Sequence, residues 1–402
     1  MKYSISNSEK IKIQEGKMFT LIKNIEVYTP EYVGEKSVLL CGDKIAQIDN
    51  EISYNLKNMK IIDGRGKKLM PGIIDQHMHI TGGGGEGSFK TRVPEVMLSS
   101  LTKGGVTTVV GLLGTDSTTR SVENLVAKTK ALKEEGINGY CLTGAYAYPS
   151  PSITGSIKRD ITFIDEVIGV KIAFSDHRSS AITSDELARI ATEARVGGLL
   201  SGKTGYVTMH MGDGNMSLDP VYEIIKKYDI PINHFRPTHV GRNEKLFNDA
   251  VKFNKNGGYI DFTAGYSKER EHICDLFQTM KNENVHLERV TLSSDGNGSW
   301  SLYDRDGKVV KIGASSCDTV FKQIVAFTEN KVFDFAKALE FGTSNVAKAI
   351  GIDDSRGYVK EGYFADLIIT DMENKIECVI ANGDIMVKNG VPVKKGTFED
   401  LA

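Results

Sequence analysis

Residues 71–87, which read PGIIDQHMHITGGGGEG, join an apolar run to two histidines and a glycine-rich turn. The apolar run predicts a buried strand that begins soon after Pro71. A spacing of two places His77 and His79 on the same face of an extended strand, where both imidazoles can reach one ion. The glycines allow the backbone to approach a ligand closely. This stretch therefore predicts a strand that ends in a functional site.

The pattern that begins at Pro71 continues along the chain. Apolar runs typical of buried strands alternate with segments of helical spacing, such as 121–136 and 184–198. The eight strand-like runs are residues 73–80, 106–113, 139–146, 168–174, 206–211, 232–240, 259–264 and 290–295. Strands and helices that alternate over roughly 280 residues fit the size of a parallel barrel. We therefore expect an α/β fold in which residues 71–354 form a metal-dependent (β/α)8 TIM barrel, the catalytic domain.

The two ends of the chain have a different pattern. Short β-type runs with turn residues between them occur in the first seventy residues and again after about residue 355. Asn-Gly dipeptides in the second group indicate tight turns. We expect residues 1–70 and 355–402 to pair with each other in one small, discontinuous β-sandwich domain.

The composition excludes several classes of protein. The chain has 402 residues with 50 Lys and Arg against 52 Asp and Glu, a net charge of −2. No long basic stripe is present to hold a phosphate backbone, so we expect no nucleic acid partner. No apolar run approaches the 18 or so residues that a membrane-spanning helix needs, so we expect no membrane association.

The start of the chain and its cysteines bear on location. The first residues, MKYSISNSEKIKIQEG, lack the apolar centre of a signal peptide. The five cysteines are odd in number, widely spaced and without a C-x-x-C pair, which is typical of reduced thiols. We therefore expect a cytoplasmic protein.

Four of the eight histidines fall at the carboxyl ends of predicted strands, the ends that face the active site of a barrel. His77 and His79 end the first strand, His210 the fifth and His239 the sixth. Asp75, one pleat deeper than His77, could orient an imidazole. An isolated H-x-H pair is more often polar packing, but histidines at three strand ends favour a metal site.

Two further strand ends carry side chains suited to a metal site. Lys171 lies in the apolar run IGVKIAF, where an ammonium is expensive to bury without a partner. Its deprotonated amine could react with carbon dioxide to give a carbamate, a two-oxygen ligand able to bridge two ions. Asp295, at the end of the eighth run, could bind a metal and accept a proton from bound water. Alone, Lys171 could reach solvent and Asp295 could form a turn with Gly296.

These positions resemble the two-metal members of the amidohydrolase superfamily: H-x-H after the first strand, lysine after the fourth, histidine after the fifth and sixth, and aspartate after the eighth. Within that superfamily the chain is similar to the isoaspartyl dipeptidases, also called β-aspartyl dipeptidases. The similarity covers almost the whole chain, including residues 357–367. The segments that carry it are PGIIDQHMHITGGGGEG, TTVVGLLGTDS, LTGAY, IGVKIAFSDHRS, HMGD, PTHVGRN and TLSSDGNGS.

The resemblance implies a zinc-dependent hydrolase that cleaves the isopeptide bond of small β-aspartyl dipeptides with a hydroxide that bridges two zinc ions per subunit. It also implies a homo-oligomer. The implied metal ligands are His77, His79 and Asp295 for one zinc, His210 and His239 for the other, and a carboxylated Lys171 that bridges both. The implied substrate contacts are Gly84, Gly85, Glu86, Thr115, Tyr146, Arg178, Arg242 and Ser299.

The residue types suit such a substrate, which carries one ammonium and two carboxylates. Glu86 can pair with the ammonium, whereas Arg178 and Arg242 have the forked geometry that carboxylates prefer. For catalysis we expect the Tyr146 hydroxyl to donate to the developing oxyanion. We expect Asp295 to take a proton from the attacking water and deliver it to the departing amine.

Three other functions were weighed. Residues 197–204, GGLLSGKT, match a phosphate-binding P-loop, but a helix is predicted before them and a strand after them, the reverse of the order that P-loop needs. A non-catalytic scaffold related to hydantoinases would show eroded ligands, and here every ligand position is filled. The nearest alternative is another amidohydrolase that cleaves cyclic amides or N-acyl amino acids, whose substrates need fewer charged partners.

Overall fold

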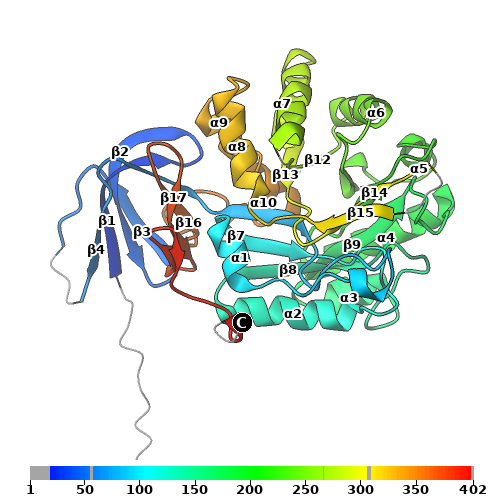
Figure 1. The fold of residues 1–402 in the computed structure, drawn as a ribbon, viewed down its shortest axis with the longest axis horizontal. Coiled ribbons are helices and arrows are strands. Elements are labelled where there is room, and N and C mark those ends of the chain that lie inside the picture. The colour runs from blue at the N-terminus through cyan, green and yellow to red at the C-terminus, as the bar shows by residue number, and fades with distance from the viewer. Residues whose placement is uncertain (1–18, 55–57, 266, 306–308, 400–402) are drawn as a thin grey trace, which may run out of the picture.

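The computed structural model describes residues 19–54, 58–265, 267–305 and 309–399 of the chain. The sequence start considered for a signal peptide, and residues 1–18 of the expected β domain, lie outside the described residues. Two parts are visible in Figure 1: a β-sheet built from both ends of the chain, and a larger body in which strands and helices alternate.

Parallel strands form the centre of the larger body, and all eight predicted runs contain one. Every residue of β6 and β7 is buried, as expected for strands covered on both faces. The strands are β6 (Ile73–Met78), β7 (Val106–Gly111), β8 (Asn138–Gly144), β9 (Val167–Phe174), β10 (Tyr206–Met211), β11 (Phe235–Thr238), β12 (Ile260–Thr263) and β13 (Val290–Ser293).

The parallel strands curl around the centre of the body in the predicted order. Among the described residues, hydrogen bonds join β6 to β11 in one sheet and β12 to β13 in another. The two sheets continue one another, since β12 lies beside β11 and β13 beside β6. Met78 also forms a parallel bridge with Gly296, just after β13. The α/β class is therefore confirmed as a curled parallel sheet, whereas one continuous ladder of eight strands is not present.

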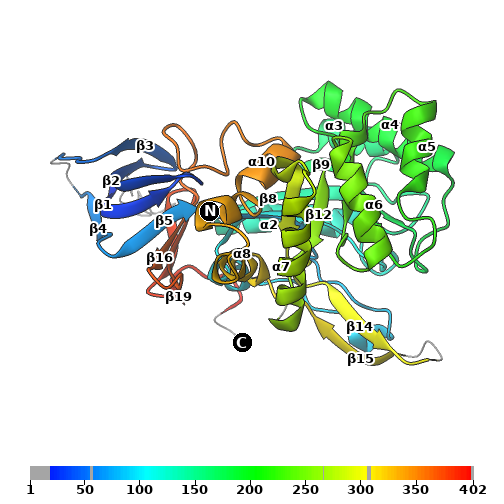
Figure 2. The ribbon, with the colours of Figure 1, turned by 90° about the horizontal axis from the view of Figure 1, so that it is seen from above.

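Helices follow the strands and cover the outer face of this sheet (Figure 2). Local sequence explains where they begin and end. Thr183 and Glu186 form a reciprocal capping box at the start of α4, and Gly136 ends α2 in a left-handed conformation with φ of 112°. The helices are α1 (Leu98–Lys103), α2 (Val122–Glu135), α3 (Ile157–Phe163), α4 (Ser184–Ser201), α5 (Asp219–Lys227), α6 (Glu244–Lys255), α7 (Ser267–Asn282), α8 (Thr319–Glu329), α9 (Phe335–Glu340) and α10 (Ser344–Ile350).

Both ends of the chain contribute to a second sheet, as predicted. β16 pairs antiparallel with β5, with Leu367 opposite Pro71, so the last strands extend the first ones (Figure 1). The expected β-sandwich is not confirmed, because the hydrogen bonds between described residues form one nine-stranded sheet. Its strands are β1 (Phe19–Tyr28), β2 (Tyr32–Cys41), β3 (Lys44–Asp49), β4 (Lys60–Asp63), β5 (Lys67–Pro71), β16 (Leu367–Asp371), β17 (Ile376–Ala381), β18 (Asp384–Lys388) and β19 (Val391–Pro392).

A two-stranded hairpin projects from the body and was not predicted. It consists of β14 (Ser299–Tyr303) and β15 (Val309–Ala314), which pair antiparallel (Figure 2). The hairpin begins four residues after Asp295, so its first residue lies next to the strand ends.

The P-loop alternative fails on the structure. Residues 197–201 form the end of α4 and residues 202–204 lead toward β10, so the first glycines lie within a helix and a strand follows the segment. Lys203 donates to the carbonyls of Ile161, Ile164 and Val167 at 2.6–3.1 Å, which anchors the end of α3. This lysine is therefore structural.

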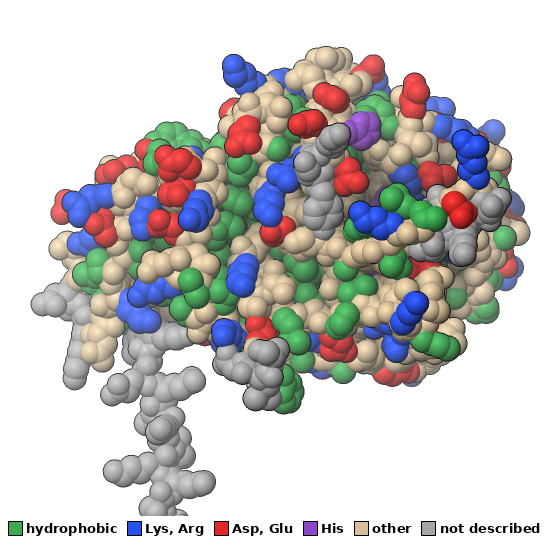
Figure 3. All heavy atoms as spheres, in the orientation of Figure 1, with side chains coloured by type: hydrophobic (Ala, Val, Ile, Leu, Met, Phe, Trp, Pro, Cys, Tyr) green, Lys and Arg blue, Asp and Glu red, His purple; other side chains and the backbone are tan. Residues whose placement is uncertain are grey.

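The near balance of acidic and basic residues in the composition is visible on the surface. Acidic and basic side chains are interspersed over both parts of the molecule on the face in Figure 3. Within the described ranges, none of the helices has both the length and the apolar character required to cross a bilayer.

Candidate metal and substrate site

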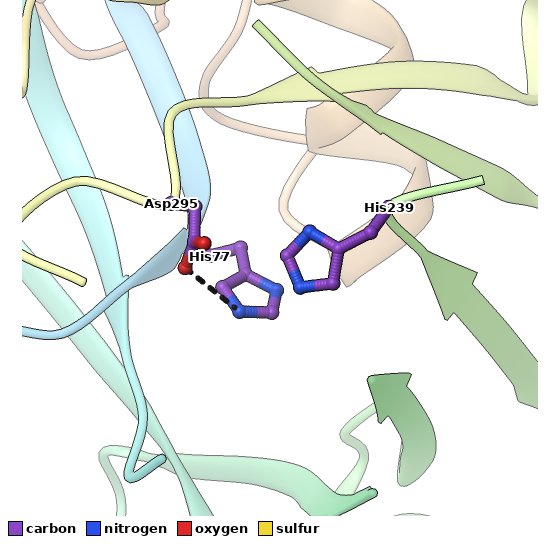
Figure 4. A group of neighbouring side chains, drawn as sticks. All are labelled: His77, His239 and Asp295. Atoms are coloured by element: carbon purple, nitrogen blue, oxygen red, sulfur yellow. Dashed lines mark ion pairs between the residues drawn. The ribbon is translucent and has the colours of Figure 1, made fainter. Parts of the chain in front are cut away.

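The six predicted metal ligands converge at the carboxyl ends of the parallel strands. Figure 4 shows three of them, His77, His239 and Asp295, which come from the ends of β6, β11 and β13 and point toward one another. One potential ligand atom of each lies within 4.8 Å of the others. The tertiary structure thus brings together His77 and Asp295, which are 218 positions apart in the chain (295 − 77).

The remaining predicted ligands surround this group. His79 Nε2 lies 3.2 Å from Asp295 Oδ1, and Lys171 Nζ lies 2.9 Å from His77 Nε2. The ring centroids of His210 and His239 are 4.6 Å apart. His77 and His79 therefore both lie close to Asp295, and the ring of His239 lies between those of His77 and His210, 4.9 Å from the first and 4.6 Å from the second.

Hydrogen bonding of His239 engages one nitrogen of its imidazole and leaves the other for a metal. His239 Nδ1 lies 2.6 Å from the Thr263 hydroxyl, whereas its Nε2 is buried and has no hydrogen-bond partner. A buried nitrogen without a partner is costly unless a ligand occupies its lone pair. A histidine whose second nitrogen is held by a neighbouring group is the usual arrangement at a metal. The donor set of imidazoles and a carboxylate therefore fits a divalent cation.

Burial keeps the site's groups in the protonation states that bind metals. It lowers the pKa of Lys171 to about 7 and that of His210 to about 3. Burial also holds the pKa of His77 well below its usual range. Burial acts to raise the pKa of Asp295, but a hydrogen bond with His79 holds it below its ordinary value. Neutral imidazoles and an ionised carboxylate are the forms that coordinate cations.

Two ligand residues have a left-handed backbone, which is uncommon for residues other than glycine. His239 has φ of 62° and directly follows β11, and Asp295 has φ of 49° and lies two residues after β13. Such conformations cost on the order of 1–3 kcal/mol each and persist where the surrounding structure requires them. Their occurrence at two strand ends that meet is typical of a functional site.

The predicted ammonium-binding residue, Glu86, is surrounded by other predicted substrate contacts. Thr115 donates to Glu86 Oε1 at 3.3 Å, and Ser299 donates to both carboxylate oxygens at 3.1 and 3.2 Å. Arg178 Nη1 lies 3.4 Å from Glu86 Oε1. Four segments of the chain therefore meet at one carboxylate beside the metal ligands.

Gly84 and Gly85 lie in the turn that carries Glu86, and both have positive φ, 81° and 103°. A side chain on Gly84 would place its Cβ 2.3 Å from the carbonyl oxygen of Thr91, so only glycine fits. The turn borders a cavity of about 220 Å³, lined by Gly84, Gly85, Glu86, Phe89, Arg92, Thr115, Asp116, Thr118 and Thr119.

Tyr146 reaches the ligands from the end of β8. Its hydroxyl lies 2.5 Å from His210 Nδ1, and burial raises its pKa, so the hydroxyl keeps its proton.

The predicted role of Asp75 is wrong in detail: it accepts hydrogen bonds from the backbone N–H groups of His77 and Ser294 at 3.2 Å rather than from an imidazole. Asp75 therefore joins the ends of β6 and β13.

Sequence reasoning missed two residues that contact the site. Asp176 accepts from Nε and Nη2 of Arg178, each at 2.9 Å, and its side chain is only 2% exposed. Arg120 donates to the carbonyls of Thr81, Gly83 and Val93 and so holds the turn before Glu86 in place. The signal available for Asp176 was its place between Lys171 and Arg178. No comparable signal in the sequence points to Arg120.

Arg242, the last predicted contact, lies at the rim. Its Nη1 is 3.7 Å from Asp176 Oδ2, and its side chain is 30% exposed. The structure therefore brings the predicted site residues into one region, in which Arg178 lies between Glu86 and Asp176.

Comparison with known proteins agrees with this arrangement. The sequence profile of the amidohydrolase family matches residues 69–386. The β-aspartyl dipeptidase of Fervidobacterium islandicum AW-1, solved in complex with the β-Asp-Leu dipeptide, is 42% identical with a TM-score of 0.86, over 93% of this chain and 98% of that one. A D-hydantoinase that is 15% identical, with a TM-score of 0.68 over 94% of this chain and 97% of that one, shares the fold.

More distant sequence relatives have other activities. The adenine deaminase of Clostridium perfringens is 24% identical over 388 residues. The match covers 94% of this chain but only 61% of the deaminase, so the chain spans about three fifths of that relative's length.

Proposed function

Because the chain belongs to the β-aspartyl dipeptidases of the amidohydrolase family, we propose that it hydrolyses the isopeptide bond of β-aspartyl dipeptides. The observation that carries this proposal is the convergence of His77, His239 and Asp295 within 4.8 Å, close to a carboxylate and two guanidinium groups. The F. islandicum relative supports a hydrolase that acts on dipeptides, because the similarity extends over 93% of this chain and 98% of that one.

The charges of the site match those of the substrate. A β-aspartyl dipeptide has one ammonium, which suits Glu86, and two carboxylates, which suit Arg178 and Arg242. Thr115 and Ser299 hold the Glu86 carboxylate by hydrogen bonds and so fix its orientation. An α-linked isomer has the same charges at different separations, so the fixed positions of these groups favour one isomer.

We propose two zinc ions as the resident metals. His77, His79 and Asp295 would hold the first, and His210 and His239 the second. Lys171 would bridge them as a carbamate, formed when its neutral amine adds carbon dioxide and releases a proton. When bound, the metals would supply Lewis-acid chemistry, which acidifies water from a pKa of 15.7 to about 7 and polarises a carbonyl.

The protein's own residues would move the protons and stabilise charge. Asp295 is ionised, so it can accept a proton from the attacking water and pass it to the departing amine. The Tyr146 hydroxyl stays protonated and can donate a hydrogen bond to the carbonyl oxygen as negative charge develops there. Gly84 and Gly85 leave room for the substrate to lie against the backbone.

The family fold leads to further proposals about the whole chain. We propose that the eight parallel strands close into a (β/α)8 barrel over residues 71–354, with the sheet of the chain ends as a separate β domain. A cytoplasmic location is in keeping with the five cysteines, all of which are free thiols. The homo-oligomer remains a proposal that rests on the resemblance.

Hydrolysis of β-Asp-Leu beside α-Asp-Leu tests the proposed function. We expect release of leucine from the β-linked isomer, loss of activity with a chelator, and recovery with added zinc. Metal analysis of the active protein should give two zinc ions per chain. Cleavage of the α-linked isomer alone would contradict the proposed substrate, and full activity in chelator would contradict the metal site.

A further inference from the structure

Asp176 is a buried carboxylate near the strand ends, and the proposed mechanism does not use it. It lies two residues after β9, on the loop between Lys171 and Arg178. Its Oδ1 accepts from the backbone N–H of Arg178 at 2.8 Å and from Nε at 2.9 Å, while its Oδ2 accepts from Nη2 at 2.9 Å. Oδ2 also lies 3.1 Å from His210 Nε2.

The contact with His210 determines which imidazole nitrogen can bind a metal. A lone pair on Nε2 would face the negative oxygen of Asp176, so the proton belongs on Nε2, where it donates to Oδ2. Arg178 Nη2 lies 3.1 Å from the same nitrogen, but it donates to Oδ2 at 2.9 Å, so the two nitrogens share one acceptor. The lone pair is therefore on Nδ1, the nitrogen beside the Tyr146 hydroxyl.

The contacts with Arg178 determine how its guanidinium is presented. Asp176 occupies the Nε and Nη2 edge of the group. Nη1 is left to face Glu86 and the substrate region. Since a guanidinium on a flexible arm loses orientation without such a partner, the carboxylate sets the direction from which Arg178 meets a substrate.

We propose that Asp176 is a positioning residue that serves both halves of the site through one carboxylate. It fixes the tautomer of His210 that presents Nδ1 to a metal, and it fixes the guanidinium of Arg178 that receives a substrate carboxylate. This inference rests on the proposed function for its substrate half, whereas the metal half depends only on the residues around His210.

Zinc affinity tests the metal half. The affinity of metal-free protein for zinc is measured by competition with a chromogenic chelator, for the wild type and for Asp176→Asn. We expect the variant to bind zinc about 10- to 100-fold more weakly, the usual effect of removing a group that orients a ligand. Arg178→Lys should leave zinc affinity within about twofold, because it retains the Asp176 carboxylate beside His210.

Steady-state kinetics test the substrate half. For β-Asp-Leu, Asp176→Asn should raise KM about tenfold or more, as expected when a charged hydrogen bond is lost, even at saturating zinc. Two analogues locate the effect: β-Ala-Leu lacks the α-carboxylate, and β-Asp-leucinamide lacks the terminal one. The rise in KM should disappear for the analogue that lacks the carboxylate bound by Arg178. A rise of full size with both analogues would overturn the proposal.

The sheet of the chain ends offers a matched control. Asp366 is also a buried aspartate that pairs with an arginine, Arg356, but it is far from the ligands in the fold. Asp366→Asn should therefore change neither zinc affinity nor KM. If Asp176→Asn does not fold, Asp176→Glu replaces it, since the longer side chain keeps the charge but cannot keep both contacts.

The outcomes separate this inference from the proposed function. Weaker zinc binding together with a higher KM supports the inference. A folded variant in which either quantity stays within twofold of the wild type overturns it, because one carboxylate is proposed to serve both. If the wild type does not cleave β-Asp-Leu, the proposed function fails, and unchanged zinc affinity in Asp176→Asn would then overturn the metal half on its own.

Discussion

Two buried aspartates that pair with arginines, one in each part of the molecule, share a chemistry but differ in their surroundings. Asp176 pairs with Arg178 where the parallel strands end, and Asp366, the residue before β16, pairs with Arg356 beside the sheet of the chain ends. Burial raises the pKa of Asp366 despite its arginine. Burial acts on Asp176 in the same direction, but hydrogen bonds from His210 and Arg178 hold its pKa below the usual range.

The difference shows what separates a functional pair from a structural one. Asp366 receives its other hydrogen bonds from Asn138 and from the backbone of Asn382, so the protein itself uses all of its contacts. Asp176 lies beside two guanidinium groups, because Arg242 Nη1 is also 3.7 Å from it. Arg178 and Arg242 are the groups proposed to bind the carboxylates of a substrate.

Among the variants at the functional and structural sites, Asp295→Asn should cause the largest loss of kcat. It removes the proposed proton carrier, and loss of a general acid or base typically costs about 10²- to 10⁴-fold in kcat. The measurement is kcat for β-Asp-Leu at saturating zinc, with the zinc content determined for the same sample. Wild-type turnover in this variant would show that Asp295 carries no proton.

Tyr146→Phe should have the next largest effect. Removing one hydrogen bond to a developing oxyanion typically lowers kcat about 10²- to 10³-fold, and the variant should fold normally. Thermal unfolding and kcat are measured together. Unchanged turnover would place the Tyr146 hydroxyl outside the reaction and leave its contact with His210 as structural.

Asp366→Asn sharpens the comparison from the structural side. It leaves Arg356 buried without an ionised partner, which typically costs about 3–5 kcal/mol in the free energy of unfolding. Chemical denaturation measures this loss, and kcat/KM per folded molecule should not change. A loss of activity without a loss of stability would show that the sheet pair is not merely structural.

The smallest expected effect is a change in stability with pH. It concerns another buried carboxylate, Glu166, and the two lysines that pair with it. Lys130 and Lys133 each lie 2.8 Å from Glu166 and, against burial, hold its pKa at about 2 instead of 4.5. Since the folded pKa is the lower one, the stability that Glu166 contributes is complete above pH 4.5 and is lost as the pH falls toward 2.

Glu166→Gln should therefore remove part of the acid sensitivity. Between pH 4.5 and 2 the wild type should lose more unfolding free energy than the variant. Above pH 5 or so the difference between them should be constant. Denaturation curves at four or five pH values measure this, and parallel pH profiles would contradict the assigned ion pairs.

The sequence was sufficient to predict the strand ends and the polar side chains that meet there. His77, His79 and Lys171 were predicted because apolar runs that alternate with helical segments identify buried strands, and a polar side chain at the end of such a strand is conspicuous. The pairing of the two chain ends was also predicted, and β16 does pair with β5.

Other features left no comparable signal. The hairpin of β14 and β15 has short strands with no apolar periodicity to distinguish them from a loop. Alternation within strands could not distinguish a sandwich from the single nine-stranded sheet that forms, because both bury one face of each strand. Asp176 was missed because an aspartate on a loop has many ordinary roles, such as forming a turn.

By itself, the sequence determined the order of strands and helices and the residue types at the strand ends, because periodicity and composition are local properties of the chain. Only the tertiary structure decided which atoms meet. Lys171 Nζ and His77 Nε2 are 94 positions apart in the chain yet 2.9 Å apart in space, and Asp176 reaches His210 across 34 positions. Contacts of this kind depend on how the sheet curls and where each loop turns, and burial and hydrogen bonds then shift the pKa of groups such as Lys171, His210 and Asp295.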